Sequence, residues 1–452
     1  MKNNRSLAIS IKISEELRNK AMLGFISDFI PDNIFDEEVL LNSRDRVFTP
    51  RNTLETMLLT STLEDKSLKN SVTQFYIVHQ HRRAIMEQEL KHQTEFEKNE
   101  KKNKPPLRGR PKKFELKLPK SKTSNISLNT AGYSKARKRL PIQLTASLFE
   151  SSKITDAKNN YSHWHDLKVL EADGTYLQLQ DTPEIRKEYP VKNSHEGGYP
   201  QSLLETITER GTGQVVNFRL SSRAVSELAL MHDILDDINS GHILLMDDLY
   251  NCYEILSKCI TNNIHFVVPA KRKRNYKVIR TLGKGDDIIE ISKPKKRSKW
   301  ANKEDALLPK LTLRRINCVS PDGKEYILFT SVIDENIDKG DIQMLYLTRW
   351  DIEVSIREIK TIMDINILRS KTPEMLKKEL NVSLAAYNLI RKIIYASLKD
   401  LPFSPKEDFI YKFYTNNKTI LIDKKGRVYN RWSTGRKRNN ATNPESNIAQ
   451  TT

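Results

Sequence analysis

Apolar positions along the first part of the chain follow a helical period. In residues 1–97 they recur three and four residues apart, as at Leu54, Met57 and Leu58. Asn52 precedes this run as a candidate helix cap, and residues 67–97 continue as a long helix with a polar face. We therefore expect an all-helical N-terminal domain.

A different pattern begins near His165, where short apolar runs alternate with amphipathic stretches. The run HILLMDD (residues 242–248) is continuously apolar until it ends in two acids, as expected of a buried strand. Further strands are expected at residues 167–181, 215–221 and 264–270, and helices at residues 142–152, 225–238, 250–260 and 375–398. Strands that alternate with helices predict an α/β fold.

Residues 271–341 break this alternation. A basic stretch is followed by two segments of alternating character, KLTLRRINCV and EYILFTSVI, which flank a Pro321-Asp-Gly turn. This pattern predicts a β-rich insertion within the α/β core.

Positive charge is concentrated in two stretches of a chain whose formal net charge is +19. Residues 101–139 contain fourteen Lys and Arg residues and one acid, and residues 271–299 contain twelve and three. Concentrated positive charge attracts a polyanion and makes its binding salt-dependent. We expect the partner to be DNA or RNA. An anionic membrane is the alternative, but neither stretch has the pattern of the amphipathic helix that it would require.

The first basic stretch lies in a segment rich in Lys, Pro, Ser and Asn, which predicts a flexible linker over residues 98–140. Within it, Arg108-Gly-Arg110-Pro resembles an AT-hook core. An extended Arg-Gly-Arg-Pro can lie in a narrow A·T minor groove, where the negative potential holds both arginines. A generic solvated linker is the alternative.

Membrane insertion, secretion and disulfide bonding are not indicated. No apolar run reaches the roughly 18 residues of a membrane span, and the first 25 residues lack the apolar segment of a signal peptide. Cys252, Cys259 and Cys318 show no CxxC spacing, so neither a disulfide framework nor a zinc site is indicated. We expect a cytoplasmic protein that associates with the nucleoid.

Residues 346–360 (YLTRWDIEVSIREIK) contain neither Pro nor Gly and predict a helix. At about 100° per residue, Tyr346, Arg349, Glu353 and Lys360 share one face. One carboxylate among an aromatic ring and cations is unusual for a face that packs against a core. A solvated face with i,i+4 ion pairs is the alternative interpretation.

Two further acids could meet Glu353. Asp173 lies within an expected strand, and Asp247 ends another. Clustered carboxylates suffer desolvation and mutual repulsion unless a cation neutralises them. Mg²⁺ prefers oxygen ligands, and two such ions about 3.5–4 Å apart support in-line attack at phosphorus. The alternative is that these acids lie in loops and on the surface.

The spacing of Tyr346, Arg349, Glu353 and Lys360 matches the Y-R-E-K signature of the family-four branch of insertion-sequence DDE transposases. The chain therefore resembles these transposases. DGTYLQLQDTPE around Asp173 is similar to that family's first motif, and LLMDDLYNCYEIL is similar to its second. ARKRLP before the core and LAAYNLIR after the signature are also similar. The likeness covers roughly residues 42–398.

The resemblance implies a ribonuclease H-like catalytic core. Asp173, Asp247 and Glu353 would be the catalytic triad and would bind two Mg²⁺ ions, for which Mn²⁺ could substitute. Such a protein would cut the terminal inverted repeats of a transposon, free a 3′-OH at each end and transfer these strands into target DNA. A homodimer would bring the two ends together.

The residue patterns and the resemblance together divide the chain into parts. They are a helical N-terminal DNA-binding domain (1–97), the basic linker (98–140), the first part of the catalytic core (141–270), the β-rich insertion (271–341), the second part of the core (342–405) and a basic tail (406–452). Two residues depart from the family pattern. Asp248 stands where the family usually has Arg and could replace Asp247 as a ligand, and Ile185 stands where Asn is frequent.

The expected DNA contacts come from several segments. Tyr346, Arg349 and Lys360 would hold the backbone of the transposon end, as the resemblance implies. Trp300 could stack on a flipped base, although packing is the alternative. Candidate contacts to phosphate are the basic residues Lys271, Arg272, Lys273 and Arg274, for which a solvated loop is the alternative.

Two rival functions belong to other classes. His163-Trp164-His165 fits the His-hydrophobe-His motif of metal-dependent rolling-circle nucleases, in which an extended chain places both histidines on one face. A non-catalytic DNA-binding or architectural protein derived from a transposase would need only the basic segments.

Overall fold

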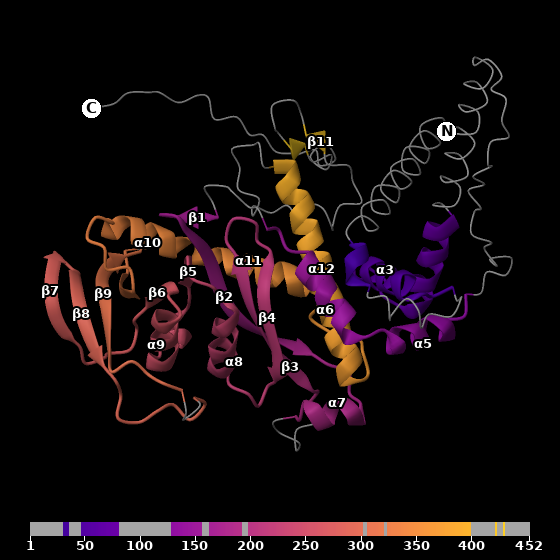
Figure 1. Ribbon diagram of the computed structural model, residues 1–452, viewed down its shortest axis with the longest axis horizontal. Coiled ribbons are helices and arrows are strands. Elements are labelled where there is room, and N and C mark those ends of the chain that lie inside the picture. The colour runs from indigo at the N-terminus through magenta and orange to yellow at the C-terminus, as the bar shows by residue number, and fades with distance from the viewer. Residues whose placement is uncertain are drawn as a thin grey trace, which may run out of the picture.

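The computed structural model describes residues 30–35, 47–80, 128–155, 162–191, 198–301, 305–320, 323–398, 421–422 and 428–429. These residues form a helical N-terminal part and a large mixed sheet with helices on both faces (Figure 1). A long helix, α12 (Pro373–Leu398), lies between the two. The predicted α/β class is confirmed.

The N-terminal part contains short helices that pack against one another. Helix α3 (Pro50–Ser61) begins at Thr49, whose hydroxyl accepts a hydrogen bond from the backbone N–H of Asn52 at 3.1 Å. Asn52 is therefore inside the first turn, and its predicted capping role was wrong. Residues 68–80 are also helical, whereas residues 81–97 of the predicted long helix lie outside the described residues.

The end of the predicted flexible linker is a helix. Residues 131–139 form α5 (Ala131–Arg139), and α6 (Ile142–Ser151) follows it. Tyr133 is buried in α5, with its ring centroid 5.2 Å from that of Phe48. This aromatic contact anchors the segment, which corrects the linker prediction at its C-terminal end. Residues 98–127 lie outside the described residues.

Five strands form the centre of the sheet, in the order β4-β3-β2-β5-β6. Strand β3 is antiparallel to both β2 and β4, whereas β5 is parallel to both β2 and β6. The short β1 pairs with β2. The bounds are β1 (His163–Trp164), β2 (Leu167–Gln178), β3 (Gln201–Glu209), β4 (Val215–Ser222), β5 (His242–Leu245) and β6 (His265–Pro269).

The stretch predicted as a β-rich insertion contains four antiparallel strands that extend the same sheet. Strand β10 pairs with β6, and the order continues to β9, β8 and β7. This extension lies at the opposite end of the molecule from the N-terminal helices (Figure 1). The bounds are β7 (Lys277–Gly283), β8 (Asp286–Ser292), β9 (Lys310–Val319) and β10 (Glu325–Thr330).

Alternate residues of the central strands face two separate hydrophobic cores. Leu244 and Met246 belong to the core beneath α8 (Glu227–Ile234) and α9 (Tyr253–Thr261), as does Leu170 of β2. Their neighbours Ile243 and Leu245 belong to the core beneath α10 (Lys339–Leu347). Successive side chains of a strand point to opposite faces, so a continuously apolar strand serves both cores. The 3₁₀ turn η3 (Leu235–Asp237) follows α8.

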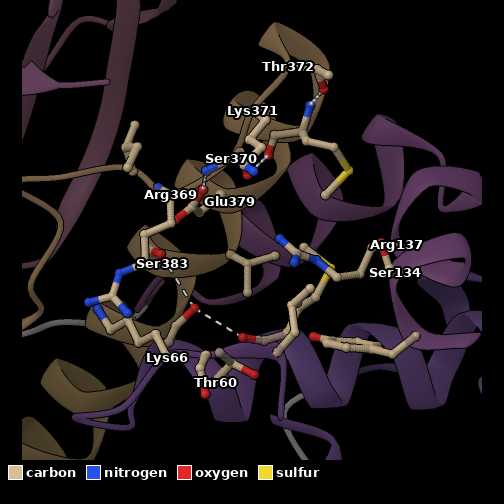
Figure 2. Close-up of a pocket in the computed structure, with 18 of the residues that line it drawn as sticks. Thr60, Lys66, Ser134, Arg137, Arg369, Ser370, Lys371, Thr372, Glu379 and Ser383 are labelled. Atoms are coloured by element: carbon tan, nitrogen blue, oxygen red, sulfur yellow. Dashed lines mark hydrogen bonds between the residues drawn. The ribbon is translucent and has the colours of Figure 1, made fainter. Parts of the chain in front are cut away.

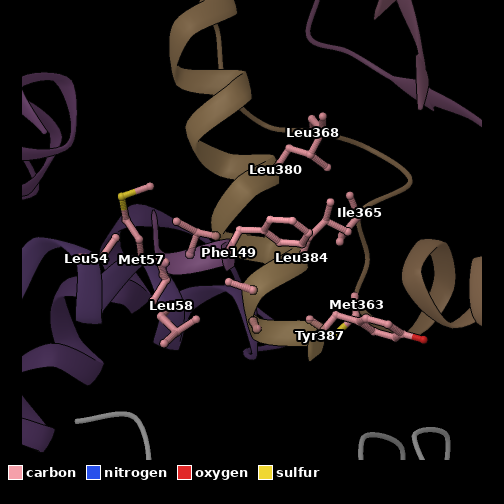
Figure 3. Close-up of a cluster of buried hydrophobic side chains, with 14 of the residues drawn as sticks. Leu54, Met57, Leu58, Phe149, Met363, Ile365, Leu368, Leu380, Leu384 and Tyr387 are labelled. Atoms are coloured by element: carbon pink, nitrogen blue, oxygen red, sulfur yellow. The ribbon is translucent and has the colours of Figure 1, made fainter. Parts of the chain in front are cut away.

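A third core joins the N-terminal helices to the rest of the protein. Figure 3 shows Leu58 of α3, Phe149 of α6 and Leu384 of α12 in this cluster of buried side chains. Ile185, the departure from the family pattern, is fully buried in the same cluster, within α7 (Pro183–Glu188). The N-terminal part therefore shares its core with α12.

The signature stretch is helical but changes pitch three times. Helix α10 is followed by a 3₁₀ turn η5 (Thr348–Trp350), by α11 (Asp351–Arg357) and by a π-helical turn η6 (Glu358–Ile362). The Thr348 hydroxyl donates to the carbonyl of Leu345 at 2.7 Å, and the N–H of Met363 donates five residues back, to Glu358. The prediction of one uninterrupted α-helical face was therefore wrong.

The remaining described elements are short. They are η1 (Asp32–Ile34), η4 (Asp248–Tyr250) and a two-stranded sheet of β11 (Leu421–Ile422) and β12 (Val428–Tyr429). Among the described residues, no helix combines the length and the apolar composition needed to cross a lipid bilayer.

Candidate active site

The register between β2 and β5 brings the first two predicted acids together. The parallel pairing aligns Glu171 with Leu245, and Asp173 and Asp247 each follow two residues later. Asp173 also lies opposite Thr206 of β3, whose hydroxyl donates to the Asp173 carbonyl at 3.1 Å. The carboxyl group of Asp173 accepts a hydrogen bond from the Gly174 N–H at 2.9 Å.

The two adjacent acids after β5 have different partners. Asp247 caps the turn η4 and accepts a hydrogen bond from the N–H of Leu249 at 2.6 Å. Asp248 instead accepts from the backbone N–H of Lys271 at 2.9 Å, so its carboxylate ties η4 to the chain that leaves β6. The charge of Asp247 acts on Asp173.

The electrostatic environment of Asp173 favours its protonated form. Burial raises the pKa of Asp173 to about 6, although the hydrogen bond from Gly174 opposes this change. The charges of Glu227 and Asp247 raise the pKa further, and that of Arg349 lowers it. Asp173 therefore lies among acids, with Arg349 close enough to compensate in part.

Two glutamates that the sequence analysis did not single out lie beside these aspartates. The hydroxyl of Tyr250 is 2.9 Å from Oε1 of Glu205 and 2.7 Å from Oε1 of Glu227. A phenol carries one hydrogen, so both hydrogen bonds together require a proton on one of the two carboxyl groups. Burial raises the pKa of both glutamates, and that of Glu205 is well above its usual range.

Gly174 is the residue that makes room for these carboxylates. Glu205 is its partner across the β2–β3 ladder. A Cβ atom at Gly174 would lie 2.5 Å from Cδ of Glu227 and 2.8 Å from Oε2 of Glu205. Such distances are too short for any side chain, so glycine is required here while the carboxylates keep these positions.

Tyr346 and Arg349 of the signature reach the same region. Burial raises the pKa of Tyr346 to about 12, Arg349 lowers it, and the charges of Asp247 and Asp248 raise it. The guanidinium of Arg349 is therefore close to Tyr346 as well as to Asp173. Arg349 belongs to the turn η5.

Glu353, the third predicted acid, forms an ion pair with Arg349, whose charge in turn acts on Asp173. Its Oε1 is 3.4 Å from Nη2 of Arg349, and about half (49%) of its side chain is exposed, against 11% for Arg349. Helix α11, which carries Glu353, contacts β2. Lys360 lies in the π-helical turn η6 and is half-buried.

The donor set beside Asp173 suits a hard cation. Among the described residues, no three His, Cys, Asp or Glu side chains are arranged as a metal-binding group. However, Oε2 of Glu205 is buried without a hydrogen-bond partner in the described part of the chain, and Gly174 leaves the space around it open to the neighbouring carboxylates. Carboxylate oxygens are the ligands that Mg²⁺ and Mn²⁺ prefer.

The other predicted DNA contacts are spread along the chain. Lys271, Arg272 and Lys273 are exposed, whereas Arg274 is half-buried and donates to the carbonyl of Asn251. Trp300 packs against the core beneath α8 and α9, with its ring centroid 5.9 Å from that of His232. Arg108 and Arg110 lie outside the described residues.

The His-hydrophobe-His motif does not lie on one extended strand. His163 belongs to β1, but His165 turns the chain with a φ of 45°. Nε2 of His165 is 4.0 Å from the Asp341 carboxylate. The two histidines therefore lack the shared strand face that the rolling-circle alternative requires.

A separate cavity of about 510 Å³ lies between the N-terminal helices and α12 (Figure 2). Lys66 enters it and donates to the backbone carbonyls of Met363 and Asp364. Burial lowers the pKa of Lys66. None of the predicted site residues lines this cavity, whose cationic side chains are Lys66, Arg137, Lys138, Arg369 and Lys371.

Comparison with known proteins identifies the same region of the chain. The family model described as "Transposase DDE domain" matches residues 164–389. This range includes Asp173, Asp247 and Glu353, together with the strand that carries Glu205 and the helix that carries Glu227.

Curated relatives of the chain come from insertion sequences. The chain is 30% identical over 266 residues to "Transposase InsG for insertion sequence element IS4" of Escherichia coli (strain K12), covering 57% of this chain and 59% of the relative. It is 33% identical over 76 residues to "Transposase for insertion sequence element IS421" of Escherichia coli, covering 17% of this chain and 20% of that relative. The chain thus spans less than two thirds of the length of either relative.

A solved structure also shows a partial likeness. It is the "Cryo-EM structure of piggyBac transposase synaptic complex with hairpin DNA", with 12% identity and a TM-score of 0.31. The match covers 54% of this chain and 51% of the other. A likeness of this size carries no argument about fold or function.

Proposed function

This chain belongs to the DDE transposase family and is similar to the transposase of IS4. From that premise we propose that it cuts the ends of a mobile DNA element and transfers the freed 3′-OH strands into target DNA. The observation that carries the proposal is the meeting of Asp173, Asp247 and Arg349 beside the sheet, although they come from three distant parts of the sequence.

We propose that the core is ribonuclease H-like. The order β4-β3-β2-β5-β6 supports this proposal, because it begins with three antiparallel strands and continues with two strands parallel to β2. Asp173 on the middle strand and Asp247 after its parallel neighbour then occupy one edge, where a helix from later in the chain can supply a third carboxylate. The β7–β10 strands continue this sheet past β6.

Asp173, Asp247 and Glu353 are the proposed ligands of two Mg²⁺ ions, for which Mn²⁺ substitutes. When bound, the ions activate the attacking oxygen and stabilise the leaving oxygen at phosphorus. Glu353 must turn from Arg349 toward the aspartates to take part. The pair joins a half-exposed carboxylate to a largely buried guanidinium, so coordination of a divalent ion has to outweigh the loss of this contact.

When Glu353 turns toward the aspartates, the Arg349 guanidinium loses this ion pair and can face DNA instead. A guanidinium forms bidentate hydrogen bonds with phosphate, and Tyr346 lies beside it. We propose that Tyr346, Arg349 and Lys360 hold the backbone of the element end next to the acids. Lys271, Arg272 and Lys273 are exposed and extend this contact along the DNA. In a homodimer, the second protomer would make the same contacts at the other end of the element.

The first experiment separates cutting from binding. Purified Glu353→Gln is compared with the unchanged protein for Mg²⁺-dependent nicking of an element end, and for binding of the same DNA by mobility shift. We expect nicking to be abolished and the binding constant to stay within a factor of about 3, because Gln keeps the shape but is a poor ligand for Mg²⁺. Equal loss of binding and cutting would contradict a metal role for Glu353.

A non-catalytic DNA-binding protein is the competing function. The ion pair between Glu353 and Arg349, in place of a carboxylate cluster, favours it. It predicts that the unchanged protein binds ends but never nicks them with Mg²⁺ or Mn²⁺, so the same assay decides between the two.

The second experiment assigns the metal ligand after β5. Because the Asp248 carboxylate accepts a hydrogen bond from Lys271 N–H, we expect Asp248→Asn to retain most of the nicking activity. Asp247→Asn should lose it. Retained nicking in Asp247→Asn together with loss in Asp248→Asn would reverse the assignment.

A further inference from the structure

A bridge of Glu205, Tyr250 and Glu227 lies beside the two aspartates and has no role in the chemistry described above. We propose that Glu227 is a further carboxylate of the divalent-cation site, which it strengthens through its negative charge, and that Tyr250 and Glu205 position it. This inference rests on the proposed function, since that function places the cation at Asp173 and Asp247.

The position of the Glu227 carboxylate is the first support. Glu227 is the first residue of α8, yet its side chain reaches back over β2, so that its Cδ would be 2.5 Å from a Cβ at Gly174. Gly174 directly follows Asp173. The carboxylate therefore lies above the strand position next to the first proposed ligand, and its charge acts on Asp173.

Tyr250 couples this carboxylate to the other proposed ligand. Tyr250 belongs to the turn η4, which Asp247 caps. Its hydroxyl donates to Glu227 across 2.7 Å, and the same hydroxyl is 2.9 Å from Glu205. One tyrosine thus links the turn that holds Asp247 to α8 and to β3, and it holds Glu227 at a set place relative to both aspartates.

An orphan oxygen is the second, independent support. Glu205 is fully buried, and its Oε2 has no hydrogen-bond partner in the described part of the chain. The same oxygen would be 2.8 Å from a Cβ at Gly174, so it points into the space that Glu227 shares. A buried polar atom without a partner destabilises the folded protein. Packing alone does not explain why two acids face this space, whereas a nearby divalent cation would stabilise both.

The comparison with Glu353 strengthens the assignment. Glu353 is half exposed and paired with Arg349, whereas Glu227 is held by a buried hydroxyl. A fixed charge costs no reorganisation when a cation arrives. We therefore assign to Glu227 the cation-attracting charge that is present before Glu353 turns inward.

The test measures the binding of Mn²⁺ to the full chain without DNA. Calorimetry and electron paramagnetic resonance give the dissociation constant. Removal of groups that support a metal site typically lowers metal affinity about 10- to 100-fold, and we expect Glu227→Gln to weaken Mn²⁺ binding by such a factor. The matched controls are Glu184→Gln and Tyr199→Phe, which make the same chemical changes at exposed positions. They should bind Mn²⁺ like the unchanged protein.

The stability of the metal-free protein should change in the opposite direction to its Mn²⁺ affinity. If Glu227 serves the cation site, its charge repels Asp173 and Asp247 when no cation is bound. Glu227→Gln should then unfold at an equal or higher urea concentration in EDTA, while its Mn²⁺ affinity falls. Lower stability with unchanged Mn²⁺ affinity would show a purely structural role and overturn the proposal.

A double-variant cycle tests the positioning role of Tyr250. Tyr250→Phe keeps the ring and removes the hydroxyl, and we expect a smaller loss of Mn²⁺ affinity than in Glu227→Gln. Since Tyr250 would act through Glu227, the double variant should bind Mn²⁺ no more weakly than Glu227→Gln alone. Additive losses would overturn this part of the proposal.

Asp173→Asn separates the two levels of inference. Loss of Mn²⁺ binding in Asp173→Asn with normal binding in Glu227→Gln would refute the role of Glu227 and leave the proposed function standing. Unchanged Mn²⁺ binding in both variants would contradict the cation site itself.

Discussion

The fold buries several carboxyl groups of the candidate site, and burial disfavours their charged forms. Asp173, Glu205 and Glu227 all have raised pKa values, for which burial is the first cause and neighbouring acids add to it. Arg349 is the cation whose charge opposes this at Asp173. Perturbed carboxyl groups that cluster in this way are typical of functional sites, because stability alone would favour apolar residues or ion pairs.

The first prediction concerns the pH dependence of stability. Since the pKa of Asp173 is about 6 in the folded protein, against an ordinary 3.8, the folded state binds this proton more tightly than the unfolded state. The contribution of Asp173 to stability is therefore complete below pH 3.8 and is lost as the pH rises through about 6. Asn cannot ionise, so Asp173→Asn should gain roughly 1–3 kcal/mol over the unchanged protein between pH 4 and pH 8.

Urea unfolding of both proteins in EDTA at several pH values measures this difference. Taking the difference cancels the groups that titrate far from Asp173, whereas Glu205 and Glu227 interact with Asp173 and respond to the substitution. A constant difference from pH 4 to pH 8 would show that burial does not disfavour the Asp173 carboxylate.

The second prediction concerns metal addition. Mg²⁺ should raise the urea midpoint of the unchanged protein more at pH 8 than at pH 5, because the carboxylates must lose their protons to bind it. Asp173→Asn should show little increase at either pH. An equal increase in both proteins would indicate that Mg²⁺ stabilises them elsewhere.

At the scale of elements, the pitch of the signature segment depends on α12. Arg391 of α12 is fully buried and forms an ion pair with Glu358, the first residue of η6. Tyr387 also donates to the Glu358 carboxylate, at 3.3 Å. These contacts hold the end of the segment that carries Arg349, Glu353 and Lys360. Irregular helical turns often occur at functional sites. Here the buried ion pair of Glu358 with Arg391 holds the π-helical turn η6 in place.

The third prediction follows from that ion pair. Arg391→Met removes the buried guanidinium that neutralises the Glu358 carboxylate, which should lower the free energy of unfolding by about 3–5 kcal/mol. Lys377→Met on the same helix is the control, since Lys377 pairs with Glu188 at 2.9 Å on the surface. An exposed pair is worth about 0–1 kcal/mol.

Thermal or urea unfolding of the two variants compares a buried with an exposed pair on one helix. The double variant Glu358→Gln/Arg391→Met should recover part of the loss, because no charge remains buried. Similar small effects for Arg391→Met and Lys377→Met would mean that the pair does not stabilise η6.

At the scale of the whole molecule, the helical N-terminal part and the sheet are joined by a common core. Leu54, Met57 and Leu58 of α3 lie in the same cluster as Leu380 and Leu384 of α12 (Figure 3). Lys66, which Figure 2 labels, donates hydrogen bonds from the N-terminal part to the backbone carbonyls of Met363 and Asp364, directly after η6. A displacement of the N-terminal helices would therefore reach α12, and through Arg391 the signature segment.

The fourth prediction is that the N-terminal part and the sheet unfold together. Leu58→Ala should cost about 2–5 kcal/mol, as expected for a fully buried leucine, and unfolding should remain a single transition. Circular dichroism and tryptophan fluorescence should give the same midpoint. Ile77→Ala is the control, since Ile77 is 46% exposed and surface substitutions usually stay within about 0.5 kcal/mol. Two separate transitions in Leu58→Ala would show that the N-terminal part unfolds on its own.

The sequence by itself determined the elements whose pattern is local. Continuous apolar runs marked β5 and β6, because strands that face two cores have no polar side. Alternation marked β9, whose observed bounds equal the predicted segment. The spacing of Tyr346, Arg349, Glu353 and Lys360 identified the family, because that motif is a property of the chain and not of its packing.

Only the tertiary structure decided which acids meet. Strand β3 (QSLLETITE) was not predicted, because its Ser, Thr and Glu side chains are buried like its leucines and no alternation is visible. Glu205 was missed with it. Its contact with Tyr250 spans 45 residues of sequence, and the approach of Asp173 to Asp247 depends on the parallel register of β2 and β5. Periodicity records the environment of each residue along its own element, whereas register and crossover connections determine which distant residues become neighbours.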